Sequence, residues 1–135
     1  MRIIAIDYGT KRTGIAVTDP LQLIASGLCT VPTAELIPFL KKYIASEPVE
    51  AFVIGQPKRM NNEDSEVEAN IQQCIRSLQK EFPTIAIHRQ DERFTSKLAF
   101  QSMLEGGLKK KQRQNKALID EISATLILQS FLEYR

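Results

Sequence analysis

The chain opens with two apolar runs separated by a polar turn. Residues 3–6 form a continuous apolar run, as expected of a strand covered on both faces, and residues 15–17 form a second one. Gly9 and Gly14 bracket the polar positions between the two runs. The pattern predicts a β-hairpin whose first strand ends on a carboxylate, Asp7, in the central part of a sheet. A buried carboxylate requires a partner, a proton or a metal ion.

A third strand and the first helix follow the hairpin. Imperfect alternation over residues 23–31 predicts the strand. Apolar residues at helical spacing then predict a helix that begins shortly before Pro38 and ends at Pro48, because a proline deeper inside would remove a backbone hydrogen bond. The short apolar run of residues 51–54 predicts a buried parallel strand.

The second half of the chain alternates in the same way. Residues 65–68, Ser-Glu-Val-Glu, have the form of a capping box and predict the start of a helix that ends at Pro83. The elements expected next are a strand at residues 85–87, a helix from Thr95 or Ser96 to Glu105, and a largely apolar helix from about Lys116 to Leu132. This order predicts an α/β fold, in which a mixed five-stranded sheet begins with three antiparallel strands, continues with parallel strands and is flanked by helices.

Composition adds the class of protein. The 135 residues are 43% hydrophobic and 25% charged, so we expect residues 1–135 to form one globular domain. The net charge of +2 does not by itself indicate a nucleic-acid-binding protein.

No apolar stretch is long enough to cross a bilayer and no signal peptide precedes the first strand, so we expect a cytoplasmic protein with no membrane partner. Cys29 and Cys74 lack metal-ligand spacing, and we expect both to be reduced core residues.

Three carboxylates occupy positions where carboxylates are unusual. Asp7 ends the first strand, Glu92 follows the last predicted strand, and Asp120 lies inside the apolar final helix. Strand ends and a helix packed over them can bring such groups together. Clustered carboxylates repel each other unless a cation compensates, and hard oxygen ligands suit Mg²⁺ or Mn²⁺. The positions therefore favour a metal site for phosphoryl chemistry.

Each of these carboxylates also has an ordinary structural interpretation. Asp7 would cap its turn or pair with a cation in it. Glu92 would be a surface residue paired with Arg89 or Arg93, a bridge that contributes little. Asp120 would be the polar edge of an amphipathic helix. Residue pattern alone leaves both interpretations open.

Three motifs resemble one known family. Residues 6–19 (IDYGTKRTGIAVTD) resemble the opening signature of the YqgF/RuvX family, which is described as pre-16S rRNA processing nucleases or Holliday-junction-resolvase-like nucleases. Residues 91–96 (DERFTS) are similar to the second family motif, and residues 119–130 (IDEISATLILQS) to the third. Gly55-Gln56-Pro57 falls at a Gly-x-Pro turn of the family. One departure is residues 60–64 (MNNED), which lack the glycine of the family's Met-Asp-Gly-type turn.

The resemblance implies a fold and an activity. It implies an RNase H-like fold in which Asp7, Glu92 and Asp120 match the family's acidic triad, which is catalytic and binds Mg²⁺ or Mn²⁺. The implied function is metal-dependent endonucleolytic hydrolysis of structured nucleic acid, in the processing of pre-16S rRNA ends. The alternatives are a Holliday junction resolvase acting on branched DNA and a non-catalytic RNA-binding assembly module. The partner is then precursor rRNA or branched DNA, and the protein is a monomer or a homodimer.

Polar and cationic residues near the three carboxylates are the candidates for nucleic-acid binding. Glycine-bracketed turns and cationic side chains bind phosphates, and a basic segment adds sequence-independent affinity. The candidates are Thr10, Lys11, Arg12, Arg93, Lys109, Lys110, Lys111, Arg113 and Lys116. A short lysine run is also a common solvated loop, which is the alternative for residues 108–116.

A second enzyme class is less well supported. Asp7, Gly9 and Thr10 also resemble the first phosphate loop of the sugar kinase and actin superfamily, but the second phosphate loop of that architecture has no counterpart in the sequence. His88 is the single histidine, and we expect it to be structural because it lies near a strand end.

Overall fold

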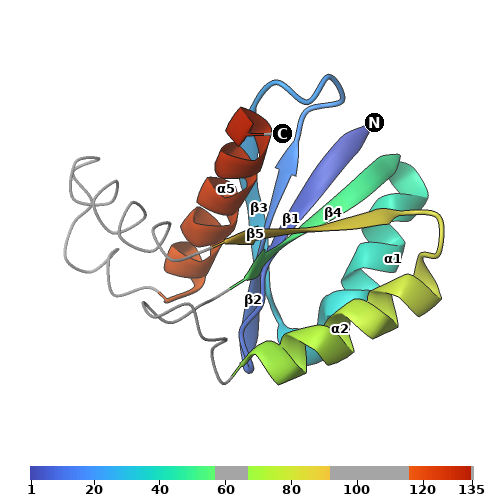
Figure 1. The fold of residues 1–135 in the computed structure, drawn as a ribbon, viewed down its shortest axis with the longest axis vertical. Helices are drawn as coiled ribbons and strands as arrows, with labels where there is room; N and C mark the ends of the chain where they lie inside the picture. The colour runs from blue at the N-terminus through green and yellow to red at the C-terminus, as the bar shows by residue number, and fades with distance from the viewer. Residues whose placement is uncertain (57–66, 92–115, 135) are drawn as a thin grey trace.

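The computed structural model describes residues 1–56, 67–91 and 116–134 (Figure 1). The elements are, in chain order, β1 (Arg2–Asp7), β2 (Arg12–Thr18), β3 (Ala25–Pro32), the 3₁₀ turn η1 (Thr33–Glu35), α1 (Leu36–Ser46), β4 (Val49–Gln56), α2 (Glu68–Glu81), β5 (Ala86–Asp91) and α5 (Lys116–Tyr134). None of the described helices is long and apolar enough to cross a membrane.

Strand β1 lies at the centre of the sheet. The strand order is β3-β2-β1-β4-β5. β1 pairs antiparallel with β2, and β2 pairs antiparallel with β3. β1 pairs parallel with β4, and β4 pairs parallel with β5. The predicted mixed five-stranded sheet is therefore confirmed, including its antiparallel start.

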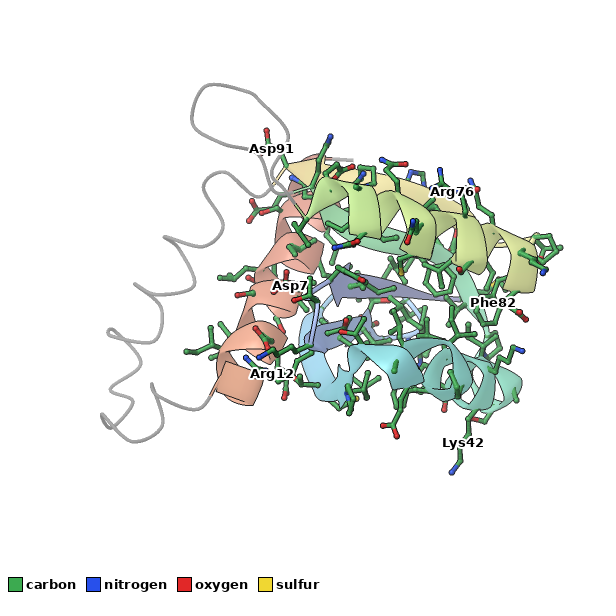
Figure 2. The ribbon with its side chains drawn as sticks, turned by 90° about the horizontal axis from the view of Figure 1, so that it is seen from below. Asp7, Arg12, Lys42, Arg76, Phe82 and Asp91 are labelled. Carbon is green, nitrogen blue, oxygen red and sulfur yellow. The ribbon has the colours of Figure 1, made fainter. Side chains whose placement is uncertain are left out.

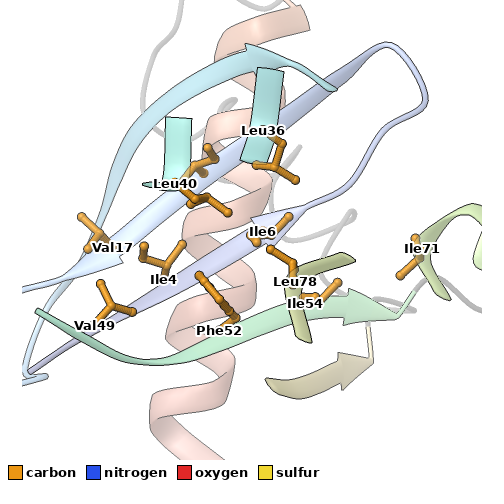
Figure 3. Packing of buried hydrophobic residues seen from close by; sticks show 11 residues of the cluster. Ile4, Ile6, Val17, Leu36, Leu40, Val49, Phe52, Ile54, Ile71 and Leu78 are labelled. Carbon is orange, nitrogen blue, oxygen red and sulfur yellow. The ribbon is translucent and has the colours of Figure 1, made fainter. Parts of the chain in front are cut away.

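Helices cover both faces of this sheet (Figure 1). α1 and α2 lie on one face, and α5 lies on the other. The core under α1 and α2 includes Ile4, Ile6, Phe52, Leu40 and Leu78 (Figure 3). The core under α5 includes Ile3, Ala5, Val53, Ala124, Ile127 and Leu128. Successive residues of β1 alternate between the two cores, which explains why its apolar run is continuous.

Prolines mark the helix boundaries as expected. Pro38 is the third residue of α1, where a backbone N–H has no partner within the helix. α1 ends at Ser46, ahead of Pro48, and α2 ends at Glu81, ahead of Pro83. The steric effect of proline on its neighbours is local, so these boundaries follow from the sequence.

The start of α2 differs from the prediction. Glu68 is the first residue of α2, whereas a capping box would make it the third, so the predicted box is wrong. Val67 precedes the helix and makes no side-chain cap hydrogen bond. The carboxylate of Glu68 is instead used in an ion pair across the fold. The predicted helix of residues 95–105 and the divergent loop of residues 60–64 lie outside the described residues.

Candidate active site

Asp7 lies at the end of the sheet where the parallel strands β1, β4 and β5 reach their C-terminal residues. It is the last residue of β1, and the neighbouring parallel strands β4 and β5 end at Gln56 and Asp91, which pair in register. Figure 2 shows Asp7, Arg12 and Asp91 on the side of the view where α5 runs, with Phe82 on the opposite side. This is the edge of an α/β sheet at which ligands usually bind.

A close approach between β2 and α5 brings Asp120 to the same place. Asp7 is directly opposite Gly14 in the β1–β2 pair. A Cβ atom on Gly14 would lie 2.1 Å from the backbone oxygen of Asp120 and 3.0 Å from the nitrogen of Glu121. Directly opposed residues of an antiparallel pair project to the same face of the sheet. Asp7 therefore projects to the face of the sheet on which α5 packs, the helix that carries Asp120.

Arg12 is the cationic partner of Asp120. Its Nε donates a hydrogen bond to Oδ2 of Asp120 over 3.1 Å. The side chains are 41% and 27% exposed, so water reaches both. This contact pairs Arg12 with Asp120, whereas the structural interpretation of the sequence offered Lys11 or Arg12 as a partner of Asp7 in the turn.

Thr33 holds the turn between β1 and β2. Its hydroxyl donates to the backbone oxygen of Gly9 over 2.6 Å, and its backbone N–H donates to the oxygen of Lys11 over 3.0 Å. The hydroxyls of Thr13 and Thr33 lie 2.9 Å apart. Thr10 and Lys11 project from this turn and are exposed. The turn thus presents two of the predicted phosphate-binding residues on a backbone held by a neighbouring element.

A partly buried ion pair joins the ends of β4 and β5 to the start of α2. Nη1 and Nη2 of Arg89 donate to the two carboxylate oxygens of Glu68 over 2.8 and 2.9 Å. Nη2 also donates to the backbone oxygen of Gly55 over 3.0 Å. Arg89, a possible partner of Glu92 in the structural interpretation, is therefore engaged with Glu68. The order of the elements indicates this pair. β4 and β5 are parallel, so the helix that connects them begins at the same end of the sheet at which β5 ends.

Several predicted site residues lie outside the described residues. Glu92 directly follows the last residue of β5 in the sequence and is one of them. The others are Arg93, Lys109, Lys110, Lys111 and Arg113, while Lys116 opens α5 but its side chain is not described. In the described part of the chain, no group of three His, Cys, Asp or Glu side chains could hold a metal ion.

The histidine packs against α5, and the two cysteines are partly buried. The ring of His88 packs on that of Phe131 in α5, with centroids 5.2 Å apart. Cys29 and Cys74 are free thiols. Burial raises the pKa of both thiols, that of Cys74 to about 11, which keeps Cys74 protonated and poorly nucleophilic at neutral pH.

The donors at this edge suit a hard divalent cation. Asp7 and Asp120 supply carboxylate oxygens, the ligands that Mg²⁺ and Mn²⁺ prefer. Their elements meet at Gly14, where any larger residue would separate them. Asp120 already accepts a hydrogen bond from a cation, so the site accommodates positive charge. Asp7 and Asp120 therefore have the chemistry to contribute two ligands to the metal that the sequence motifs imply.

Comparisons with known proteins find relatives over almost the whole chain. A family model described as "RuvX: Holliday junction resolvase" matches residues 1–134. A protein of Bacteroides thetaiotaomicron is 65% identical over 132 residues, covering 98% of this chain and 96% of the relative. A protein of Christiangramia forsetii is 59% identical over 131 residues, covering 97% of each. Both are named "Putative pre-16S rRNA nuclease".

A solved structure shares the fold. The chain of "T. thermophilus RuvC in complex with Holliday junction substrate" superposes with a TM-score of 0.57 at 17% identity, covering 98% of this chain and 96% of that one. At this identity the likeness concerns the fold alone. It confirms the RNase H-like arrangement expected from the sequence motifs.

Proposed function

This chain belongs to the RuvX family, and on that premise we propose that it is a metal-dependent endonuclease that hydrolyses phosphodiester bonds of structured nucleic acid. Its proposed substrate is the end region of pre-16S rRNA, after the names of its relatives, which implies a cytoplasmic protein. The observation that carries the proposal is that Gly14 pairs with Asp7 in the sheet and lies against the α5 backbone at Asp120.

Asp7, Asp120 and Glu92 would hold the metal, Mg²⁺ or Mn²⁺. When bound, such an ion lowers the pKa of a water molecule and neutralises charge that develops on the phosphate. The role of the chain is to hold the carboxylates in place. β1 and β2 supply Asp7 and Gly14, and α5 supplies Asp120. The assignment of Glu92 rests on its motif.

The turn after β1 would bind the substrate backbone. Thr10 and Lys11 are exposed in the turn that follows Asp7 in the chain. The hydroxyl of Thr33 donates a hydrogen bond to the backbone oxygen of Gly9 in this turn. Contacts of this kind position nucleic acid without reading its sequence. The remaining proposed contacts are those of Arg12, Arg93, Lys109, Lys110, Lys111, Arg113 and Lys116, assigned from the sequence.

Branched DNA is the second candidate substrate, favoured by the description of the family. A Holliday junction requires two cuts, which favours a homodimer, whereas trimming of an RNA end is possible for a monomer. A non-catalytic RNA-binding module is the third candidate. It would gain nothing from two acids placed beside phosphates, because like charges repel.

The test is cleavage by the purified full-length protein under titration with Mg²⁺ or Mn²⁺. The substrates are a labelled RNA that carries a pre-16S rRNA end and a labelled four-way DNA junction, assayed in parallel. We expect the wild type to cut RNA only with metal, and Asp7→Asn and Asp120→Asn to bind without cutting. Glu47→Gln is the control, because Glu47 pairs with Arg2 away from this site.

The outcomes separate the three candidates. Preferential metal-dependent cutting of the junction would replace the RNA substrate with branched DNA. Binding of RNA without any cutting, unchanged in Asp7→Asn, would refute the nuclease and support the binding module. Light scattering on the same samples gives the oligomeric state.

A further inference from the structure

We propose that Arg12 is an internal counter-ion that competes with the divalent cation for Asp120 and couples metal binding to nucleic-acid binding. In this scheme the guanidinium leaves Asp120 when the carboxylate binds metal, and it then binds a phosphate of the nucleic acid. The inference rests on the proposed function, because it requires Asp120 as a metal ligand.

The geometry places Arg12 between two possible partners. Its Nε lies 3.1 Å from Oδ2 of Asp120, so the guanidinium uses an oxygen that would otherwise be available to a cation. Arg12 is also the first residue of β2, directly after the exposed turn of Thr10 and Lys11. A rotation of this one side chain would therefore take its charge from the carboxylate to the phosphate-binding turn.

The backbone around Arg12 is fixed, so the exchange would involve the side chain alone. Arg12 pairs with Pro32 in the β2–β3 ladder. A Cβ atom on Gly9 would lie 2.3 Å from the backbone oxygen of Arg12, which shows how tightly the turn closes on it. The guanidinium, by contrast, belongs to a side chain that is 41% exposed.

The pair is weak enough to exchange. Ion pairs with this degree of exposure change an equilibrium constant by about fivefold at most. A divalent cation carries twice the charge of a guanidinium and interacts more strongly with the same carboxylate. Two cations at one carboxylate also repel each other, which favours departure of the guanidinium.

Once its guanidinium has left Asp120, Arg12 would bind a phosphate beside the turn that contains Thr10 and Lys11. A guanidinium binds phosphate through two parallel hydrogen bonds, which an ammonium cannot form. The coupling is reciprocal, since metal that strengthens nucleic-acid binding must itself be bound more tightly in the presence of nucleic acid.

The first measurement is calorimetric titration of Mn²⁺ into the full-length protein without nucleic acid. Arg12→Gln should bind Mn²⁺ about threefold to fivefold more tightly than the wild type, because the competing charge is gone. Lys11→Gln is the matched control, since it removes the same charge from the same turn, and its affinity should stay within about twofold. Arg12→Lys keeps the charge and should also stay close to the wild type.

The second measurement is binding of the labelled RNA that carries a pre-16S rRNA end, followed by fluorescence anisotropy with and without Ca²⁺, which carboxylate oxygens also ligate. Ca²⁺ should strengthen RNA binding by the wild type and by Lys11→Gln. The strengthening should be smaller by about threefold or more in Arg12→Gln and Arg12→Lys, which lack the bidentate phosphate contact.

The results distinguish this inference from the proposed function. Equal Mn²⁺ affinity in the wild type and Arg12→Gln, with loss of binding in Asp120→Asn, would overturn the counter-ion role and leave the metal site standing. Mn²⁺ binding that is unaffected by Asp120→Asn, or absent from the wild type, would overturn both. Circular dichroism of each variant verifies that it is folded.

Discussion

Replacement of Gly14 by alanine tests whether the site depends on the contact between β2 and α5. The new Cβ atom would lie 2.1 Å from the backbone oxygen of Asp120, and an ordinary contact begins at 3.4 Å. The obstructing atoms belong to a helix backbone, which cannot rotate aside as a side chain can. α5 would have to move back by about 1.3 Å at this point.

The expected cost follows from what that displacement disturbs. Forcing an extra methyl group into a packed core costs about 1–3 kcal/mol. Here α5 also carries Ala124, Ile127 and Leu128, which are fully buried against the sheet and would lose contacts. We expect the free energy of unfolding to fall by about 3 kcal/mol. Because Asp120 would also move away from Asp7, metal-dependent cleavage should fall by about 100-fold.

Gly27→Ala is the matched control for the same helix. Its Cβ atom would meet the side chain of Glu121, with Oε1 at 2.6 Å, rather than backbone. A flexible glutamate can rotate away, so the loss should stay below about 1 kcal/mol. Urea unfolding followed by circular dichroism measures both variants. Equal stability of Gly14→Ala and the wild type, with equal Mn²⁺ affinity, would refute the reasoning.

Three further predictions concern other contacts. Arg89→Met leaves the buried carboxylate of Glu68 without its cation, so the free energy of unfolding measured with urea should fall by about 3–5 kcal/mol. The double variant with Glu68→Leu should recover most of this loss. A small loss in the single variant would contradict this. The thiol of Cys74, with its pKa raised to about 11, should react with iodoacetamide at pH 8 about 100 times more slowly than a free cysteine, as measured by mass spectrometry; fast labelling would contradict its burial. Backbone N–H groups lower the pKa of Asp19, so its contribution to stability is complete above its ordinary value of 3.8 and is lost as the pH falls through the lowered pKa. The difference in Tm between the wild type and Asp19→Asn should therefore shrink as the pH falls from 6 to 2, and a constant difference would exclude this role.

Much of the fold follows from local patterns in the sequence. The apolar run of residues 3–6 predicts a strand covered on both faces, and β1 is that strand. Prolines mark the ends of α1 and α2 because they act on adjacent residues. The final helix was also predicted, and it ends two residues later than expected. Periodicity and backbone restriction act over a few residues, so a single sequence reveals them.

The site was predicted only in part. The sequence singled out Asp7 and Asp120 as unusual carboxylates, and the fold brings their elements together. The place of Glu92 beside them stays a prediction. From the sequence, Gly14 was predicted to end a turn, whereas in the structure it is the residue at which β2 contacts α5. No local pattern distinguishes a glycine needed for a turn from one needed for a close approach.

Only the tertiary structure decided which charges pair. Arg12 and Asp120 are 108 positions apart in the chain, and Arg89 and Glu68 are 21 apart. The sequence offers each arginine several carboxylates of equal chemistry, and the choice among them depends on a few ångströms of distance. Such distances are set by how the strands align and how closely the helices pack on them. The sequence therefore determined the elements and the kind of chemistry, and the packing of those elements determined the partners.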